Sequence, residues 1–477
     1  MESKADQRYL GFYVLGTSIT VSLFVSPWNS IDPTNLPKLV LLSTLGFLAG
    51  GFALARVDFF KHGKSRPFVA LTSLFLFQLL IVFLLDNRDF AFKFYGTSSR
   101  NTGTLAYTAL SFLMLAGAVS ASKRVLQRYS ISLVAVGSIL SLYGILQSRG
   151  VDFYEFNNVL ESNAIGTFGN PNFQSAFMGI TGSVALTLVC FSGANILIRL
   201  GLLVFVGLAL YNISLGSEQG YLTLLAGFTS AVVIFLLSIK QKILGYFVLG
   251  FGGVVGLLVL TGIFNKGPLA DVIYKSSLQA RSFYWEAAVR MMTDHPIFGV
   301  GLDAYGYWYR SIRTEEAATV FGPNSVSDVS HNVLLDFSSM GGFPLLILYI
   351  VLNLLVLIAA FKYIAKSKKY DPTFAAIFAG WVAYQAQSLI SINQIALATT
   401  GWILGGLIVG IEIRSRQVSI IVGKTQIEKV STFSNDPKRP LAMALGVVVG
   451  LALSSGPMIS SIKFRNAIQS GDVTRIQ

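Results

Sequence analysis

ILGYFVLGFGGVVGLLVLTGIF (residues 243–264) decides the fold class, because it is long enough to cross a bilayer and contains no charged side chain. Its apolar residues do not alternate with polar ones, as they would in a transmembrane β-strand. The whole chain of 477 residues is 53% hydrophobic and only 12% charged, whereas soluble domains carry about 25% charged residues. The sequence therefore predicts an all-α integral membrane protein.

Apolar segments of similar length recur along the chain and are separated by polar turns. We expect thirteen spans, at about residues 9–26, 36–55, 67–85, 104–122, 129–147, 172–193, 195–215, 219–239, 243–264, 333–361, 372–392, 399–413 and 440–459. The twelfth is short, so twelve spans is the alternative. The longest polar interruption, residues 265–332, falls between the ninth and tenth spans.

Lysine and arginine are unevenly distributed between the two sides of these spans. They gather after spans 2, 4, 8, 10 and 12 and are sparse after most odd-numbered spans; the loop after span 3, with Arg88, Lys93 and Arg100, is the exception. Because basic residues are enriched in cytoplasmic loops, we expect a cytoplasmic N-terminus and an outer position for residues 265–332. The same asymmetry explains the net charge of +13 without a nucleic-acid partner.

This topology divides the chain into four parts. They are a transmembrane bundle (residues 1–264), an outer loop (265–332), a second group of transmembrane helices (333–459) and an outer tail (460–477), which begins with the pattern of an amphipathic helix. The spans contain almost no ionisable side chains, so we expect the chemistry at the outer face. Cys190 is the only cysteine, which excludes disulfides within the chain and thiolate metal sites.

Two turns expected at the outer face carry polar residues that either cap helices or contact a ligand. GTFGNPNF (residues 166–173) contains Asn170, whose side chain can bond its own backbone, and Asn172, at the position expected for a helix cap. SLGSEQGYL (residues 214–222) is a tight turn in which Ser217 is a candidate cap and Gln219 is expected to face outward. The sequence leaves both interpretations open.

The outer loop contains RSFYWEAAVRMMTDHP (residues 281–296), which has helical spacing until the helix ends near Pro296. Arg281 and Arg290 fall on different faces of this helix. An arginine near the membrane surface either contacts lipid headgroups or holds a diphosphate with its forked, permanently charged guanidinium. In the following FGVGLDAY (residues 298–305), two glycines permit a close backbone approach or a turn that aims Asp303 and Tyr305 at the site.

The triplet SHN (residues 330–332) stands directly before the tenth span. His331 is the only histidine expected at the outer start of a helix. A neutral imidazole near pH 7 can take a proton from an attacking hydroxyl. The alternative is that His331 and Asn332 only cap the span.

Three motifs in order, GTFGNPNF, RSFYWEAAVRMMTDHPIFGVGLDAY and SHNVLLDFSSMGG, resemble the O-antigen ligase and polymerase superfamily of bacterial membrane glycosyltransferases. The resemblance covers about residues 30–412. It implies a GT-C-like helical bundle in the cytoplasmic (inner) membrane of a bacterium, with the outer loop over a cavity. It also implies a glycan donor on undecaprenyl diphosphate, an acceptor hydroxyl on a lipid, protein or glycan, and chemistry without metal or cofactor.

By position, the resemblance gives Arg281 the role of engaging the diphosphate and His331 that of activating or orienting the acceptor hydroxyl. Further candidates for substrate contact are Arg290, Asn332, Gln219, Asn170, Asp303 and Tyr305. The family often has an arginine in the turn where this chain has Gln219. The candidates to replace that arginine are Arg290, Arg310 and Arg313.

Two other functions stay open at this stage. Polymerases of the same superfamily would use another lipid-linked glycan as the acceptor. A transporter or flippase for a lipid-linked glycan would need polar residues along a path through the bilayer, and the expected spans lack them.

Overall fold

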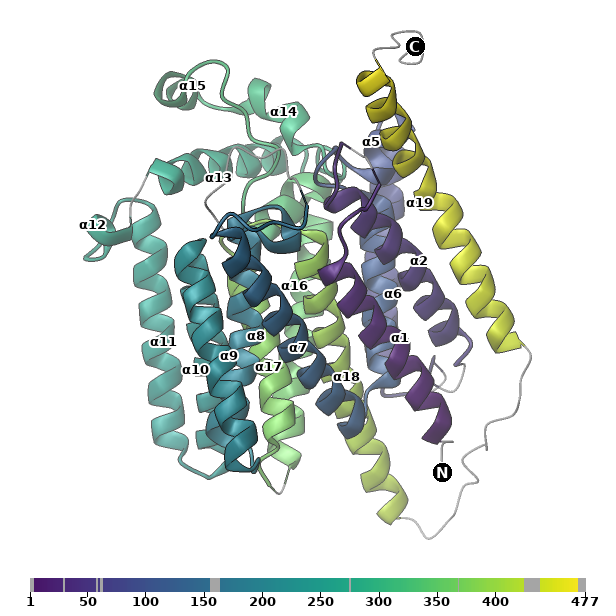
Figure 1. Cartoon of the computed structure of the whole chain (residues 1–477), viewed down its shortest axis with the longest axis vertical. Coiled ribbons are helices and arrows are strands. Elements are labelled where there is room, and N and C mark those ends of the chain that lie inside the picture. The colour runs from purple at the N-terminus through teal and green to yellow at the C-terminus, as the bar shows by residue number, and fades with distance from the viewer. Residues whose placement is uncertain are drawn as a thin grey trace.

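The structure, a computed structural model, describes residues 4–28, 31–56, 59–60, 63–154, 164–273, 276–367, 369–423 and 438–470. Within these ranges the chain forms helices and no β-strand, which confirms the all-α class. Ten of the described helices are long and apolar enough to cross a membrane, and two shorter apolar helices accompany them. Most of these helices stand side by side in one bundle (Figure 1).

Each of the thirteen expected spans corresponds to a helix. These helices are α1 (Lys4–Leu23), α2 (Asn35–Leu54), α4 (Arg66–Leu85), α6 (Thr104–Ser120), α7 (Lys123–Gln147), α8 (Pro171–Phe191), α9 (Ile196–Leu215), α10 (Gln219–Ser238), α11 (Lys242–Ile263), α16 (Val333–Lys366), α17 (Pro372–Ser388), α18 (Ile395–Gly423) and α19 (Lys438–Ser470). The expectation of a short twelfth span was wrong, because α18 continues well past its apolar segment. Helix α19 includes the first part of the tail; residues 471–477 lie outside the described residues.

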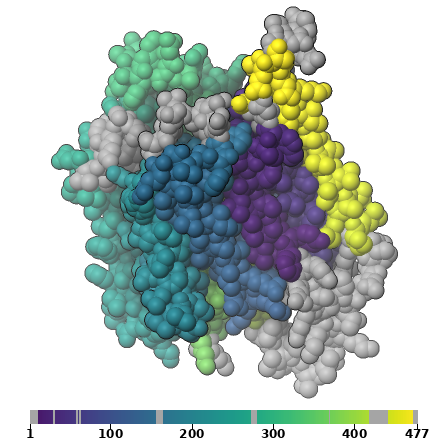
Figure 2. All heavy atoms as spheres, viewed as in Figure 1, coloured from purple at the N-terminus to yellow at the C-terminus, as the bar shows by residue number. Residues whose placement is uncertain are grey.

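Burial differs strongly between the helices of the bundle. The membrane-spanning part of α18 is buried throughout, and its glycines Gly406 and Gly410 let it approach the backbone of α6 closely. By contrast, α11 exposes nearly all of its apolar side chains. Helix α19 packs on α2 along the outside of the N-terminal helices (Figure 2). Exposed apolar side chains on such peripheral helices suit contact with lipid rather than water.

Residues between α11 and α16 form a cap at one end of the bundle. This cap contains α12 (Ala270–Ile273), α13 (Ser276–Asp294), α14 (Tyr305–Ile312) and α15 (Glu315–Phe321), and α13 lies across the ends of the upright helices (Figure 1). The N-terminus of the chain lies at the opposite end. The two positions agree with the expected topology, whereas the side of the membrane that each end faces stays a prediction.

Helix α16 is broken near the end that adjoins the cap, and the cap enters the break. Gly341 and Gly342 have non-helical backbone angles. The amides of Val300 and Gly301 donate to the carbonyl oxygens of Ser339 and Met340 at 2.8 and 3.1 Å, which the break leaves without helical partners. A Cβ atom at Gly299 would clash with the backbone of α16. The expected close approach of the FGVG segment is therefore confirmed.

Candidate active site

His331 lies in the turn between the cap and α16, and its conformation is unusual. Its φ angle is +60°, in the left-handed region that few residues other than glycine adopt. The imidazole is half-buried and stacks on the ring of Tyr284 from α13, with centroids 5.8 Å apart and planes inclined by 25°. The turn thus places the histidine side chain against the cap helix.

The turn that carries His331 is fixed by its two neighbours. Asp336, in the first turns of α16, accepts hydrogen bonds from the amide and hydroxyl of Ser330 at 2.9 and 2.7 Å. Asn332 caps α16 by accepting from the amides of Leu334 and Leu335, and its side-chain nitrogen donates to the carbonyl of Leu389. The expected cap at Asn332 is confirmed, while His331 takes no part in it.

The surroundings of His331 keep its imidazole neutral. Burial, together with the positive charges of Arg281 and Arg100, lowers the pKa of His331 to about 3. A neutral imidazole has one ring nitrogen with a free lone pair, which can accept a proton. The side chain is therefore unprotonated across physiological pH, and its low pKa makes it a weaker base than an imidazole whose pKa lies near 7.

Arg281 lies one helical turn before Tyr284 on α13. Its side chain is half-buried, burial lowers its pKa, and it makes no hydrogen bond or ion pair to another described residue. Guanidinium groups nevertheless stay charged in proteins. Arg281 therefore presents a positive charge that has no ion-pair partner among the described residues, beside the neutral histidine.

Tyr305 supports this arrangement from behind. It is fully buried, and its hydroxyl donates to the backbone carbonyl of Tyr284 at 2.8 Å. Its ring also stacks on Tyr309 of the same helix, with centroids 5.7 Å apart. We therefore assign Tyr305 to positioning Tyr284 rather than to direct substrate contact.

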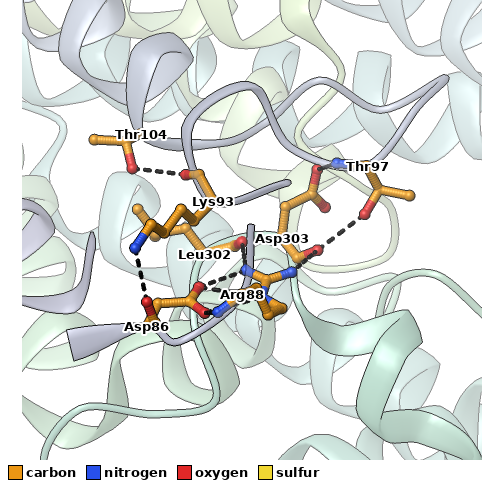
Figure 3. A network of polar contacts seen from close by, with 7 residues as sticks. All are labelled: Asp86, Arg88, Lys93, Thr97, Thr104, Leu302 and Asp303. Atoms are coloured by element: carbon orange, nitrogen blue, oxygen red, sulfur yellow. Dashed lines mark hydrogen bonds and ion pairs between the residues drawn. The ribbon is translucent and has the colours of Figure 1, made fainter. Parts of the chain in front are cut away.

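Asp303 holds a neighbouring loop instead of pointing into open space. The residue is 1% exposed, and its carboxylate accepts from the amides of Thr97 and Thr102 at 2.7 and 3.3 Å. Burial raises the pKa of Asp303, and these amide bonds oppose that shift. Arg88 pairs with Asp86 and donates to the backbone carbonyls of residues 302 and 303 (Figure 3). This polar network ties the cap to the loop before α6.

The two turns outside the cap have mainly structural contacts. Asn170, not Asn172, is the N-cap of α8, because its side chain accepts from the Asn172 amide at 2.8 Å. Ser217 is not the cap of α10; that position belongs to Glu218. Gln219 does not face outward: it is 6% exposed and donates to the Asn172 carbonyl at 2.6 Å. The hydrogen bond of Gln219 therefore joins the two turns. The expectation that the Gln219 side chain is exposed was wrong.

The other arginines of the cap are not brought to His331. Arg290 is exposed and pairs with Glu286 at 2.8 Å on the far face of α13. Arg313 donates to the backbone carbonyls of Pro323 and Ser325, and Arg310 is exposed at the end of α14. None of these three side chains is among the charges that shift the pKa of His331.

Sequence reasoning missed three residues that shape this site: Tyr284, Asp336 and Arg100. Tyr284 and Asp336 occur within the quoted motifs, but their roles depend on contacts between segments. The signal for Arg100 was present, since it belongs to the one loop that departs from the charge asymmetry. Among the described residues, no group of three His, Cys, Asp or Glu side chains comes close enough to hold a metal ion.

Comparison with known proteins identifies the segment that contains most of this site. Residues 172–350 match the model of the Wzy_C family, described as O-antigen ligase. This segment is thus similar to an O-antigen ligase domain. The domain runs from the start of α8 into α16 and includes Gln219, Arg281 and His331, so the resemblance inferred from the motifs is confirmed. Arg100 lies outside the O-antigen ligase domain. No curated protein gives a significant match to the chain.

Proposed function

We propose that this protein transfers a glycan from an undecaprenyl-diphosphate carrier to an acceptor hydroxyl on the outer face of a bacterial cytoplasmic membrane. The O-antigen ligase domain supports a glycosyltransferase-like enzyme of the ligase or polymerase type. The observation that carries the proposal is the neutral His331 in a left-handed backbone conformation, stacked on Tyr284 and influenced by Arg281, which has no ion-pair partner among the described residues. In this proposal the N-terminus is cytoplasmic, and residues 265–332 and the tail face outward.

The reaction that fits these groups is a displacement at the anomeric carbon of the donor. The acceptor oxygen bonds to this carbon while the bond from the carbon to the diphosphate oxygen breaks. The acceptor proton passes to the free nitrogen of His331, and undecaprenyl diphosphate leaves with the bonding electron pair. General bases contribute about 10²- to 10⁴-fold to the rate, with the largest effects when the pKa of the base lies near the operating pH.

Arg281 has a separate task, because negative charge builds on the diphosphate as it leaves. A preorganised donor aimed at developing charge contributes about 10²- to 10³-fold in other enzymes. In our proposal this guanidinium, rather than a metal ion, balances the charge. The substrates are thus a lipid-linked glycan donor and a lipid, protein or glycan acceptor.

The test is complementation of a deletion strain with His331→Ala or Arg281→Ala, followed by analysis of transferred and carrier-linked glycan. We expect loss of transferred product with normal membrane insertion, measured by fluorescence-detected size-exclusion chromatography of a tagged protein. Arg149→Ala is the matched control, because this substitution removes the same charge at an exposed position just after α7. Wild-type product from either site variant contradicts the proposed roles.

The same strain separates ligase from polymerase. A ligase transfers finished chains, so its loss leaves long chains on the lipid carrier. A polymerase joins repeat units, so its loss leaves single units on the carrier. Either pattern is consistent with the O-antigen ligase domain.

A further inference from the structure

The loop between α5 (Phe90–Tyr95) and α6, GTSSRNTG (residues 96–103), is a closed strap with Arg100 at its tip. Its two ends meet, since a side chain at Gly96 or Gly103 would collide with the backbone of the other end. The carboxylate of Asp303 accepts amide hydrogens from both ends, at Thr97 and Thr102. The cap therefore holds the strap closed at its neck.

The residues on either side of Arg100 have left-handed backbone conformations, which reverse the chain direction at the tip of the strap. Ser99 and Asn101 have φ angles of +70° and +56°, both in the left-handed region. Such angles are costly for residues other than glycine and persist where surrounding contacts impose them. The strap thus gives Arg100 a fixed position, although the sequence around it has the composition of an ordinary loop.

Arg100 lines a narrow cavity next to the turn that carries His331. The cavity lies between the strap, the start of α2, the outer part of α16 and the connection from α17 to α18; Asn35, Asp336 and Gln394 are among its polar lining residues. Arg100 is half-buried there and makes no side-chain hydrogen bond or ion pair with another described residue. Its positive charge acts on the carboxylates of Asp336 and Asp303 as well as on His331. The hydrogen bonds of these carboxylates nevertheless come from other groups, Ser330 for Asp336 and the amides of Thr97 and Thr102 for Asp303.

Two guanidinium groups from different segments, neither with an ion-pair partner among the described residues, thus act electrostatically on the same histidine. Arg281 comes from the cap and Arg100 from the strap, and the charge of each lowers the pKa of His331. A partly buried guanidinium with no ion-pair partner among the described residues is suited to bind an anion from outside the protein. A diphosphate has several oxygens at the spacing that forked guanidinium donors match.

We propose that Arg100 is a second diphosphate-binding cation of this enzyme and that Asp303 is the positioning residue that presents it. The inference rests on the proposed function, in which the donor is a lipid diphosphate. It also accounts for the glutamine at position 219: Gln219 is buried against Asn172, and the strap supplies the second positive charge.

The first experiment measures binding of undecaprenyl diphosphate, without a glycan, to the full-length protein in lipid nanodiscs. Loss of charge-assisted hydrogen bonds predicts that Arg100→Ala weakens binding by about 10- to 100-fold. Arg100→Lys retains part of the affinity, and Arg149→Ala stays within about twofold of wild type, which is within ordinary surface effects. Unchanged binding by Arg100→Ala, or wild-type protein that does not bind this probe, overturns the inference.

The outcome is separable from that of the proposed function. If binding is lost in Arg281→Ala but kept in Arg100→Ala, this inference fails and the proposed function stands. If Arg100→Ala loses binding while His331→Ala still transfers glycan, the second cation stands and the proposed base fails. Each variant is scored only after its size-exclusion profile matches wild type.

The second experiment tests whether Asp303 acts through Arg100. Asp303→Ala opens the neck of the strap, and we expect weaker binding of the same probe. Residues that act as one unit are not additive, so the double variant Asp303→Ala, Arg100→Ala should bind no more weakly than Arg100→Ala alone. Additive losses would show that Asp303 has only a general structural role and would overturn its assignment.

Discussion

The rings of Tyr284 and His331 stack with centroids 5.8 Å apart, joining the cap helix α13 to the turn before α16. The hydroxyl of Tyr305 bonds the backbone carbonyl of Tyr284, not its side chain. The ring of Tyr284 therefore positions the imidazole. Tyr284 is in turn positioned through its backbone carbonyl, which Tyr305 binds.

Substitutions at Tyr284 test this dependence. Tyr284→Phe keeps the ring and the carbonyl, so we expect activity near wild type. Tyr284→Ala removes the stacking and should lower the transfer rate by about 2- to 12-fold, the range that such a ring contact supports. Glycan transfer by membranes with matched protein amounts measures both. Equal losses in the two variants would contradict the stacking role.

The pH dependence of glycan transfer tests the charge state of His331. Burial and the charges of Arg281 and Arg100 lower the pKa of His331 to about 3, so acidification protonates it only near that pH. We expect no loss of activity centred near pH 6.5, the ordinary value for histidine. Initial rates between pH 5 and 8, with folding checked at each pH, give the profile. An acid limb centred near 6.5 would argue against a neutral, buried base.

Asp336 should matter for both stability and activity because it fixes Ser330 by two hydrogen bonds. Asp336→Ala leaves buried donors unsatisfied, which costs about 1–3 kcal/mol. We expect a lower melting temperature and slower transfer. Ser330→Ala removes only the hydroxyl and should have the smaller effect on both. A thermal unfolding scan and a transfer assay on both variants provide the measurement, and the reverse order would refute this role.

The break in α16 can be tested at Gly342. Its φ angle is +64°, and a Cβ atom there would collide with the carbonyl of Pro296. Gly342→Ala should therefore destabilise the protein by more than about 1 kcal/mol, the usual cost of such an angle. Gly253→Ala in α11 is the control, because open space surrounds that position and alanine favours helix. Similar melting temperatures for the two variants would contradict the proposed packing.

The fold could be predicted largely from the sequence, because each span is a local property of hydropathy and length. All thirteen expected segments are helices. The extent of α18 could not be predicted from hydropathy, since Glu412, Arg414 and Arg416 interrupt its apolar sequence before the helix ends. The role of Asn332 as the N-cap residue of α16 and the close approach of Gly299 to the α16 backbone were also predictable, since each follows from the chemistry of one residue.

The arrangement of the site was less predictable, because it depends on contacts between distant segments. Asp303 looked like a ligand contact, but it binds amides about 200 positions earlier in the chain. Arg88, Lys93 and Arg100, which depart from the charge asymmetry, mark polar contacts near the site. The rule that relates basic loops to membrane topology does not predict such contacts. Arg88 and Lys93 bind carbonyl or carboxylate oxygens of the outer network, and Arg100 lines the cavity.

The insertion of Val300 and Gly301 into the break of α16 has a consequence for motion. If the cap moved away alone, the carbonyls of Ser339 and Met340 would lose their only amide partners in a poorly hydrated region. We therefore expect the cap and the adjoining end of α16 to move together. Any opening that admits a substrate must displace His331 together with Arg281, so that the base and the cation keep their separation while the entrance changes.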